Sequence, residues 1–317
     1  MAWASQWTTY DADEGTLYHF SVGRLDGRTF HVLDPPSNPA ESSVYGGRVL
    51  VAWEEAGRSV VASIDTGNGA VTELARLDLE VDDVEFGLDG DVYLLSWDGS
   101  RSRVLRMEGN GHTEQVGEPI DFSLYFTAST DHSRLAIETF AHDNLYRYRV
   151  IDTRRHTMVA IPGPPLGDIA GIFGDDLLVF TDAFSDTIDL PRPVTAIAMD
   201  GSRRELVADS QVWSTVFPDI DLTPILVFDS LTDDGRNAIS ILHLGESQPT
   251  LVYATDAHWW DLGFPIRGRG ISTPGWIPML TGRSPYEQDP QNQLHRLLIP
   301  INGGDPVDIG PEPIDSR

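Results

Sequence analysis

Hydrophobic and polar residues alternate in short runs along the whole chain, and the runs come in pairs joined by tight polar turns. The runs 17–22 and 29–33, for example, flank the pair Asp26 and Gly27. An Asp-Gly or Asn-Gly turn between alternating segments is the strongest short-range signal of a β-hairpin. No stretch of about twelve residues carries the i, i+3, i+4, i+7 spacing of an amphipathic helix, so the pattern predicts an all-β protein. The seven predicted hairpins span residues 17–33, 60–74, 104–116, 146–161, 194–207, 239–253 and 294–309.

A second marker repeats in phase with the hairpins. About 22 to 29 residues before most of the turns, an aromatic residue ends a predicted short strand. In a propeller the innermost strand of a blade ends at this place, and the aromatic ring packs between blades. Trp3 falls near the matching place in the first repeat. The other aromatic residues at this position are Tyr45, Phe86, Phe126, Phe173, Phe217 and Phe264.

The spacing of the repeats predicts the architecture. The first six turns lie about 41 to 46 residues apart, and the last interval is about 57 residues, close to the period of four-stranded propeller blades. We therefore expect one domain over residues 1–317, a seven-bladed β-propeller of four-stranded antiparallel blades, with six or eight blades as alternatives. The first repeat lacks part of its inner strand. The expected blades are residues 1–36, 37–79, 80–119, 120–164, 165–209, 210–254 and 255–312.

Several predicted second strands begin with a recognisable turn. Residues 129–136 read Ser-Thr-Asp-His-Ser-Arg-Leu-Ala, which resembles the Ser-Pro-Asp-Gly-x-x-Leu/Ile-Ala repeat of TolB-type and WD-like β-propellers. Residues 88–95 and 232–239 look like weaker copies, Pro is missing throughout, and His132 and Ser133 replace Gly in the best copy. The resemblance implies the propeller fold. It implies no single function, because that superfamily includes protein-docking modules, peptidase gating domains and polysaccharide lyases.

The charge of the chain excludes one class of ligand. The net charge is −27, the sequence pI is about 4.4, and all 22 basic residues are Arg. A field this negative repels nucleic acids and anionic membrane surfaces, so we expect neither as a partner. The apolar runs are far shorter than the roughly 18 residues that span a bilayer, and no membrane insertion is expected.

The chain has no cysteine, which excludes disulfides and thiolate chemistry. The abrupt beginning in a Trp-rich strand favours an extracytoplasmic or secreted domain whose signal segment has been removed. A cytoplasmic protein is the alternative.

No catalytic motif accompanies the repeat. The sequence lacks a nucleophile elbow, a zincin helix motif, a phosphate-binding loop and an EF-hand loop. The nine histidines are scattered and are expected in turns or on the surface, although His132 and His142 could approach each other across a hairpin. The acidic pairs are expected to cap turns. We therefore predict no cofactor and no metal ligands, while a structural divalent cation such as calcium remains an option.

The candidate ligand-binding residues come from their place in the repeat. Loops that enter the innermost strands form one rim of a propeller, where ligands usually bind. The most unusual local feature is the run around two adjacent tryptophans before a Gly- and Pro-rich insertion at about residues 267–292. Exposed Trp beside carboxylates suits a sugar or a protein partner, whereas a Trp pair in a strand also suits an ordinary core. The candidates are His258, Trp259, Trp260, Asp261, Trp276, Trp213, Asp168, Asp83 and Asp121.

Three functions fit these observations. The first is a non-catalytic propeller that binds a protein or another ligand, as part of a larger extracytoplasmic protein. The second is a carbohydrate-active enzyme, a lyase or a hydrolase, whose acids would converge in the central funnel. The third is a structural assembly subunit that docks through an apolar patch. The leading hypothesis is the non-catalytic binding domain, with protein or carbohydrate as its partner.

Overall fold

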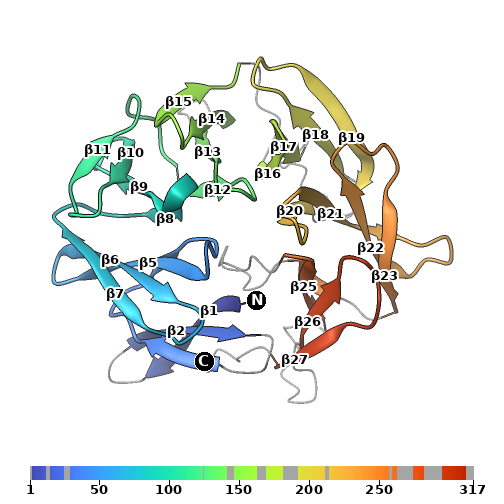
Figure 1. Cartoon of the computed structure of the whole chain (residues 1–317), viewed down its shortest axis with the longest axis horizontal. Coiled ribbons are helices and arrows are strands. Elements are labelled where there is room, and N and C mark those ends of the chain that lie inside the picture. The colour runs from blue at the N-terminus through green and yellow to red at the C-terminus, as the bar shows by residue number, and fades with distance from the viewer. Residues whose placement is uncertain are drawn as a thin grey trace. The chain divides into compact units, whose positions relative to one another are not determined.

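Strands account for nearly all of the regular structure in the computed structural model (Figure 1). The one helical element among the described residues is a 3₁₀ turn at Leu88–Gly90, so the all-β prediction is confirmed. No helix in this part of the chain is long and apolar enough to cross a membrane. The residues that the structure describes are 2–11, 15–24, 29–123, 125–140, 146–162, 169–180, 192–210, 214–256, 259–262, 274–281 and 295–311.

The strands form seven antiparallel sheets, which we number 1 to 7 in chain order. Each strand pairs with the next strand in the chain, as expected for successive hairpins. The chain divides into two compact units, one up to Ala160 with sheets 1–4 and one from Ile161 onward with sheets 5–7. The two units are described separately. The single domain and the blade boundaries expected from the sequence stay predictions.

The first unit contains fifteen strands. Sheet 1 is three-stranded, and sheets 2, 3 and 4 are four-stranded. Sheet 1 consists of β1 (Ala2–Asp11), β2 (Gly15–Arg24) and β3 (Thr29–Leu33). Sheet 2 consists of β4 (Ala40–Glu41), β5 (Arg48–Glu55), β6 (Arg58–Asp65) and β7 (Val71–Leu77). Sheet 3 consists of β8 (Asp83–Phe86), β9 (Val92–Trp97), β10 (Ser102–Met107) and β11 (Thr113–Gln115). Sheet 4 consists of β12 (Phe126–Ala128), β13 (Arg134–Phe140), β14 (Tyr146–Asp152) and β15 (Thr157–Ala160).

The second unit contains three four-stranded sheets. Sheet 5 consists of β16 (Ile169–Phe173), β17 (Asp176–Phe180), β18 (Arg192–Ile197) and β19 (Arg203–Ser210). Sheet 6 consists of β20 (Ser214–Pro218), β21 (Pro224–Leu231), β22 (Asn237–His243) and β23 (Thr250–Thr255). Sheet 7 consists of β24 (Trp259–Leu262), β25 (Trp276–Thr281), β26 (His295–Pro300) and β27 (Val307–Pro311).

The predicted hairpins are confirmed as the last two strands of each sheet. Four strands are confirmed in sheets 2 to 7, whereas sheet 1 has three within the described residues. A shortened first repeat was expected there. The seven confirmed hairpins are β2–β3, β6–β7, β10–β11, β14–β15, β18–β19, β22–β23 and β26–β27.

Most of the aromatic markers lie in the first strands of the sheets, although Tyr45 lies between β4 and β5 in an isolated bridge with Arg48. Phe86 and Phe173 end β8 and β16 as predicted. Phe126 begins β12 instead of ending a strand. Phe86, Phe126 and Phe173 are all nearly fully buried and belong to apolar clusters between sheets. Phe264 lies outside the described residues.

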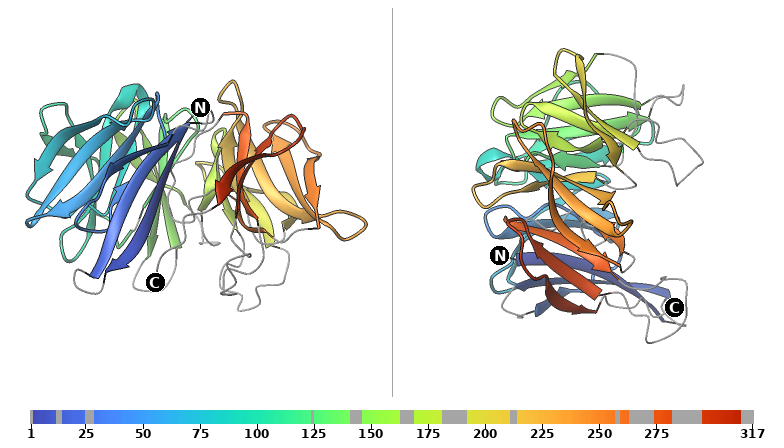
Figure 2. Two further views of the ribbon diagram at one scale, coloured as in Figure 1. Left: turned by 90° about the horizontal axis from the view of Figure 1, so that it is seen from below. Right: turned by 90° about the vertical axis from the view of Figure 1, so that its right-hand side faces the viewer.

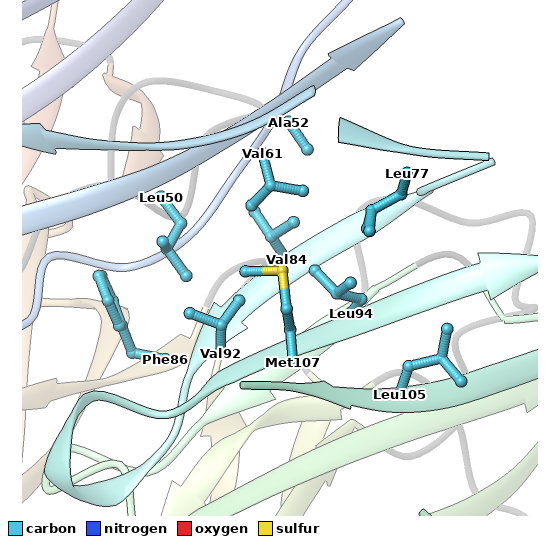
Figure 3. Packing of buried hydrophobic residues seen from close by; sticks show 10 residues of the cluster. All are labelled: Leu50, Ala52, Val61, Leu77, Val84, Phe86, Val92, Leu94, Leu105 and Met107. Carbon is cyan, nitrogen blue, oxygen red and sulfur yellow. The ribbon is translucent and has the colours of Figure 1, made fainter. Parts of the chain in front are cut away.

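Apolar side chains fill the spaces between consecutive sheets in each unit. The largest cluster between sheets 2 and 3 includes Leu50, Val61 and Val84 (Figure 3). Similar clusters lie between sheets 1 and 2 and between sheets 3 and 4, and, in the second unit, between sheets 5 and 6 and between sheets 6 and 7. A strand such as β6 is buried at six consecutive positions because its sheet is covered on both faces. Figure 2 shows the strongly twisted sheets from two further sides.

The turn that resembles the propeller motif keeps its geometry without glycine. His132 stands at the Gly position and has φ 56°, in the left-handed region that Gly favours. Asp131 Oδ1 accepts hydrogen bonds from the Ser133 N–H and from the hydroxyls of Ser129 and Ser133. Burial tends to raise the pKa of Asp131, but these hydrogen bonds outweigh burial and hold the pKa below its ordinary value. The side-chain bonds stabilise the turn strongly enough for a non-Gly residue to occupy it.

Candidate functional site

The innermost strands of neighbouring sheets are joined by buried carboxylates. Asp83 at the start of β8 is 5% exposed, and its Oδ2 accepts a 2.6 Å hydrogen bond from the Phe126 N–H of β12. Two residues further along β8, Glu85 is fully buried and accepts hydrogen bonds from the N–H and the hydroxyl of Ser43, next to β4. These acids therefore connect sheet 3 with sheets 4 and 2.

A pair of aromatic rings and a further aromatic residue come from the end of β9 and from the segment before β12. Trp97 ends β9, and its ring meets the ring of Phe122 edge to face with centroids 5.4 Å apart. Phe122 is 42% exposed and Tyr125 is 37% exposed. We call Trp97, Phe122 and Tyr125 the aromatic rim. Trp97 is partly buried, so the exposed ring surface comes mainly from Phe122 and Tyr125, three residues apart in the chain. Exposed apolar surface beside an aromatic pair is a candidate contact site.

The backbone beneath the aromatic rim is held in place on both sides. Ser102 and Ile120 exchange two backbone hydrogen bonds of 3.0 and 2.9 Å. The Ser123 N–H donates to the Ser102 hydroxyl, and the Ser123 hydroxyl donates to the Glu138 carbonyl. Ile120 and Ser123 are buried, whereas Phe122 between them points outward. A side chain presented by a fixed backbone loses little conformational entropy when a ligand covers it.

Charged residues of both signs border the aromatic rim. Asp121 Oδ2 lies 3.9 Å from Arg147 Nη1, and both side chains are partly exposed. Asp98 accepts hydrogen bonds from the Arg101 and Ser100 N–H groups and pairs with Arg103 at 2.7 Å. The bond from the Arg101 N–H is the largest of several that lower the pKa of Asp98 far below its ordinary value. An apolar centre with a charged border is the usual composition of a protein interface.

One carboxyl group beside the aromatic rim has a raised pKa. Burial, together with the nearby carboxylates of Glu80 and Asp83, raises the pKa of Asp82 to about 6, against a hydrogen bond from the Trp97 N–H that lowers it. Among the residues that the structure describes, no group donates to the buried Asp82 Oδ2. The ionised form of Asp82 is therefore disfavoured in the folded protein.

We expect Asp82→Asn to stabilise the protein at pH 7 and to have no effect near pH 4. The pKa of Asp82 is higher in the folded than in the unfolded state, so its contribution to stability is full below about pH 4 and is lost as the pH rises through about 6. Because the side chain is partly solvated, we expect a gain of about 1 kcal/mol. Urea unfolding at several pH values measures it. Asp233→Asn, in an exposed turn, is the control, and an equal gain at pH 4 and pH 7 would contradict the assignment.

The candidates from the sequence are only partly covered by the described residues. His258, Trp213 and Asp168 lie outside them. Trp259, Trp260 and Asp261 form most of β24, where a bulge separates the pairs Trp259–Thr281 and Asp261–Leu280, but their side chains are not among those described.

Three further candidates fall in described positions. Trp276 begins β25 and is partly buried. Asp83 and Asp121 both lie near the start of an inner strand in the first unit. Their binding roles stay predictions.

Sequence reasoning missed the aromatic rim itself. Its residues come from the end of β9 and from the segment before β12, about 25 residues apart, and Phe122 meets Trp97 next to the bridge between Ser102 and Ile120. It also missed a group of possible metal ligands on sheet 1, which consists of His19, His31 and Asp34. His142, the suggested neighbour of His132, lies outside the described residues, and His132 is buried.

Comparisons with known proteins show the fold. No family model matches the sequence, and no curated protein matches it. Acylaminoacyl peptidase from Pyrococcus horikoshii is similar over 97% of this chain, with 9% identity and a TM-score of 0.63, and the chain spans 50% of that protein. The propeller domain of the trilobed protease from Pyrococcus furiosus is similar over 97% of this chain and 92% of its own, with 8% identity and a TM-score of 0.60.

TolB from Acinetobacter baumannii is similar over 99% of this chain and 81% of its own, with 10% identity and a TM-score of 0.51. The chain thus resembles TolB-like propellers in fold, as the sequence motif implied. At these identities the likeness extends to the fold alone.

Proposed function

We propose that the seven sheets form one seven-bladed β-propeller that serves as a non-catalytic binding domain, and that its aromatic rim receives a polypeptide. The observation that carries this proposal is the exposure of Phe122 and Tyr125 on a backbone that hydrogen bonds hold in place. Rigid aromatic side chains beside Arg are the residues that dominate binding energy at protein interfaces.

Closure of the ring would rest on packing. Sheet 1 has three strands within the described residues. The propeller domain of the trilobed protease is described as having an open Velcro topology. We propose that this chain, too, closes without a strand shared between its first and last sheets.

The chemistry of the aromatic rim favours a polypeptide over a sugar. A sugar ring stacks on a flat aromatic face beside hydrogen-bonding groups, whereas the Trp97 and Phe122 rings are perpendicular. Phe122 also carries no polar group. Aliphatic and aromatic side chains of a peptide fill such an angular apolar surface well.

The charge of the chain indicates the character of the polypeptide. A protein of net charge −27 attracts cationic partners over long distances and repels acidic ones. We therefore expect a basic segment that contains aromatic or aliphatic anchors. Its affinity should fall as the salt concentration rises.

The alternative, a carbohydrate-active enzyme, is supported less well. It needs acids that converge on a substrate, whereas Asp83 and Glu85 on the innermost strand β8 each accept hydrogen bonds from a neighbouring sheet or its flanking residues. Asp82, with a pKa of about 6, is the described acid best suited to act as a general acid. The extracytoplasmic location expected from the sequence stays a prediction.

A random-peptide display selection on the immobilised domain tests the proposal. We expect the wild type to enrich peptides that combine Arg or Lys with aromatic or aliphatic residues. The variant Phe122→Ser/Tyr125→Ser should bind these peptides at least about thirtyfold more weakly, because two anchors of the interface are lost. Both replaced side chains are more than a third exposed, so the variant should stay folded, with only a small drop in its melting temperature from the lost Trp97–Phe122 contact.

The matched control removes two other exposed apolar side chains, through Leu231→Ser/Leu251→Ser on sheet 6. This control should retain full peptide affinity. Equal binding by the rim variant would refute the assigned surface. Release of sugar ends from a panel of polysaccharides, abolished by Asp82→Asn, would instead establish the enzyme.

A further inference from the structure

A β-bulge on sheet 1 brings three side chains with metal-binding atoms to one face. β2 and β3 pair at Ser21–His31 and at Phe20–Leu33, so Val32 is the extra residue. Phe20, Val32 and Leu33 all pack toward sheet 2. In a regular strand His31 and Asp34 would point to opposite faces, but the extra residue returns Asp34 to the side of His31. His19, one residue before Phe20, points to the same side.

The three side chains meet at one carboxylate oxygen. His19 Nδ1 lies 2.6 Å and His31 Nε2 lies 3.0 Å from Asp34 Oδ1. The two imidazole rings have centroids 6.0 Å apart. All three ligand atoms lie within 4.8 Å of one another. Ligands about 2.0 to 2.2 Å from a tetrahedral Zn²⁺ lie about 3.3 Å apart, so small side-chain rotations would accommodate an ion.

We propose that His19, His31 and Asp34 bind one divalent transition-metal ion of the Zn²⁺ class. Two imidazoles and a carboxylate are ligands that Zn²⁺, Co²⁺ and Ni²⁺ accept, whereas Ca²⁺ and Mg²⁺ require oxygen ligands. The structural calcium considered from the sequence would not fit these nitrogen atoms. Three protein ligands leave a coordination position for water or for a further donor.

The solvent exposure of these three side chains and the negative charge of the chain favour binding of a cation from solution. The side chains of His31 and Asp34 are 51% and 59% exposed, which leaves the site open to solvent. The net charge of −27 raises the local concentration of cations.

A bound ion would stabilise the pairing of the edge strand β3 in the three-stranded sheet 1. β3 is the edge strand of sheet 1 and pairs only with β2 among the described strands. A metal that joins His19 on β2 to His31 and Asp34 at the end of β3 closes the hairpin at its open end. Because the ion binds the folded state alone, its binding free energy adds to the stability of the hairpin. This role is independent of the aromatic rim.

Metal titration of the tag-free protein tests the proposal. We expect one equivalent of Co²⁺ to give the visible absorption of a tetrahedral site, and Zn²⁺ to displace it. Melting of the wild type should rise with Zn²⁺. His31→Ala and Asp34→Ala should lower the Zn²⁺ affinity at least about a hundredfold, since changes merely around a metal site already cost ten- to a hundredfold.

The controls separate a built site from general attraction to an acidic surface. His112→Ala, an exposed histidine in the turn before β11, should leave binding unchanged. Both variants at the site should melt like the wild type without metal, which excludes misfolding. Retention of one tight equivalent by His31→Ala and Asp34→Ala would overturn the proposal. Equal affinity for Ca²⁺ and Zn²⁺, or no binding beyond that of the variants, would overturn it as well.

Discussion

Replacing Glu85 by alanine is expected to destabilise the protein by about 3 to 5 kcal/mol, because a fully buried carboxylate with several donors is removed. Oε2 accepts hydrogen bonds from the N–H and the hydroxyl of Ser43, at 3.1 and 2.6 Å. Oε1 accepts a 2.8 Å bond from the Phe86 N–H and lies 3.7 Å from His132 Nδ1. Alanine would remove the carboxylate acceptor of the Ser43 N–H, the Ser43 hydroxyl and the Phe86 N–H in a largely buried place.

Graded variants check that explanation by urea unfolding. Glu85→Gln keeps the shape but turns an N–H₂ group toward buried donors, so we expect about half of the loss. Ser43→Ala removes one donor and should cost about 1 kcal/mol, with a coupling of at least about 0.5 kcal/mol between the two changes. Glu114→Ala, on the exposed strand β11, should be neutral. A change of less than 1 kcal/mol for Glu85→Ala would contradict the role assigned to Glu85.

Gly171→Ala is expected to destabilise the second unit by about 3 kcal/mol or more. Gly171 lies at a bulge of the inner strand β16 and has φ 156°. A Cβ atom there would lie 2.5 Å from Val216 Cγ2 and 2.7 Å from Val216 Cβ, on the neighbouring inner strand β20. These distances are far below van der Waals contact, so the two inner strands would have to separate.

Two further variants separate the steric contact from the backbone strain. Gly235→Ala has φ 81° and no atom within 4 Å of the added Cβ, so it should cost only about 1 kcal/mol. Val216→Ala in the Gly171→Ala background removes the clashing methyl groups and should recover part of the loss. Thermal unfolding of the four proteins measures both effects. If Gly171→Ala and Gly235→Ala cost the same, the close approach of β16 and β20 does not constrain the fold.

Local features of this fold were predictable from the sequence, because the residues that determine a hairpin are neighbours in the chain. The turn at Asp200 and Gly201, for example, joins β18 and β19 as expected. Asp200 accepts hydrogen bonds from the hydroxyl and the N–H of Ser202, and these bonds lower the pKa of Asp200. The sequence did not predict the turn at residues 219–223, because Leu222 instead of Gly occupies its left-handed position, with φ 67°.

Features that depend on distant residues were not predictable in the same way. Glu85 and Ser43 are 42 positions apart, so only the packing of sheets 2 and 3 reveals their contact. The three proposed metal ligands are brought together by a bulge, which no residue type in that strand predicts. The sequence suggested Trp259 and Trp260 as a site because two adjacent tryptophans are unusual. The residues of the aromatic rim are single aromatic residues in separate segments, which no local pattern distinguishes.

The central claim is that the aromatic rim is the surface on which a polypeptide binds. Hydrogen–deuterium exchange of the domain with and without a display-selected peptide tests it most directly, because it locates the bound peptide without any mutation. We predict that the peptide slows amide exchange at residues 97–101 and 120–128 and leaves β24 and β25 unchanged. Slower exchange confined to β24 and the start of β25, around Trp259 and Trp276, would contradict the account and restore the site expected from the sequence.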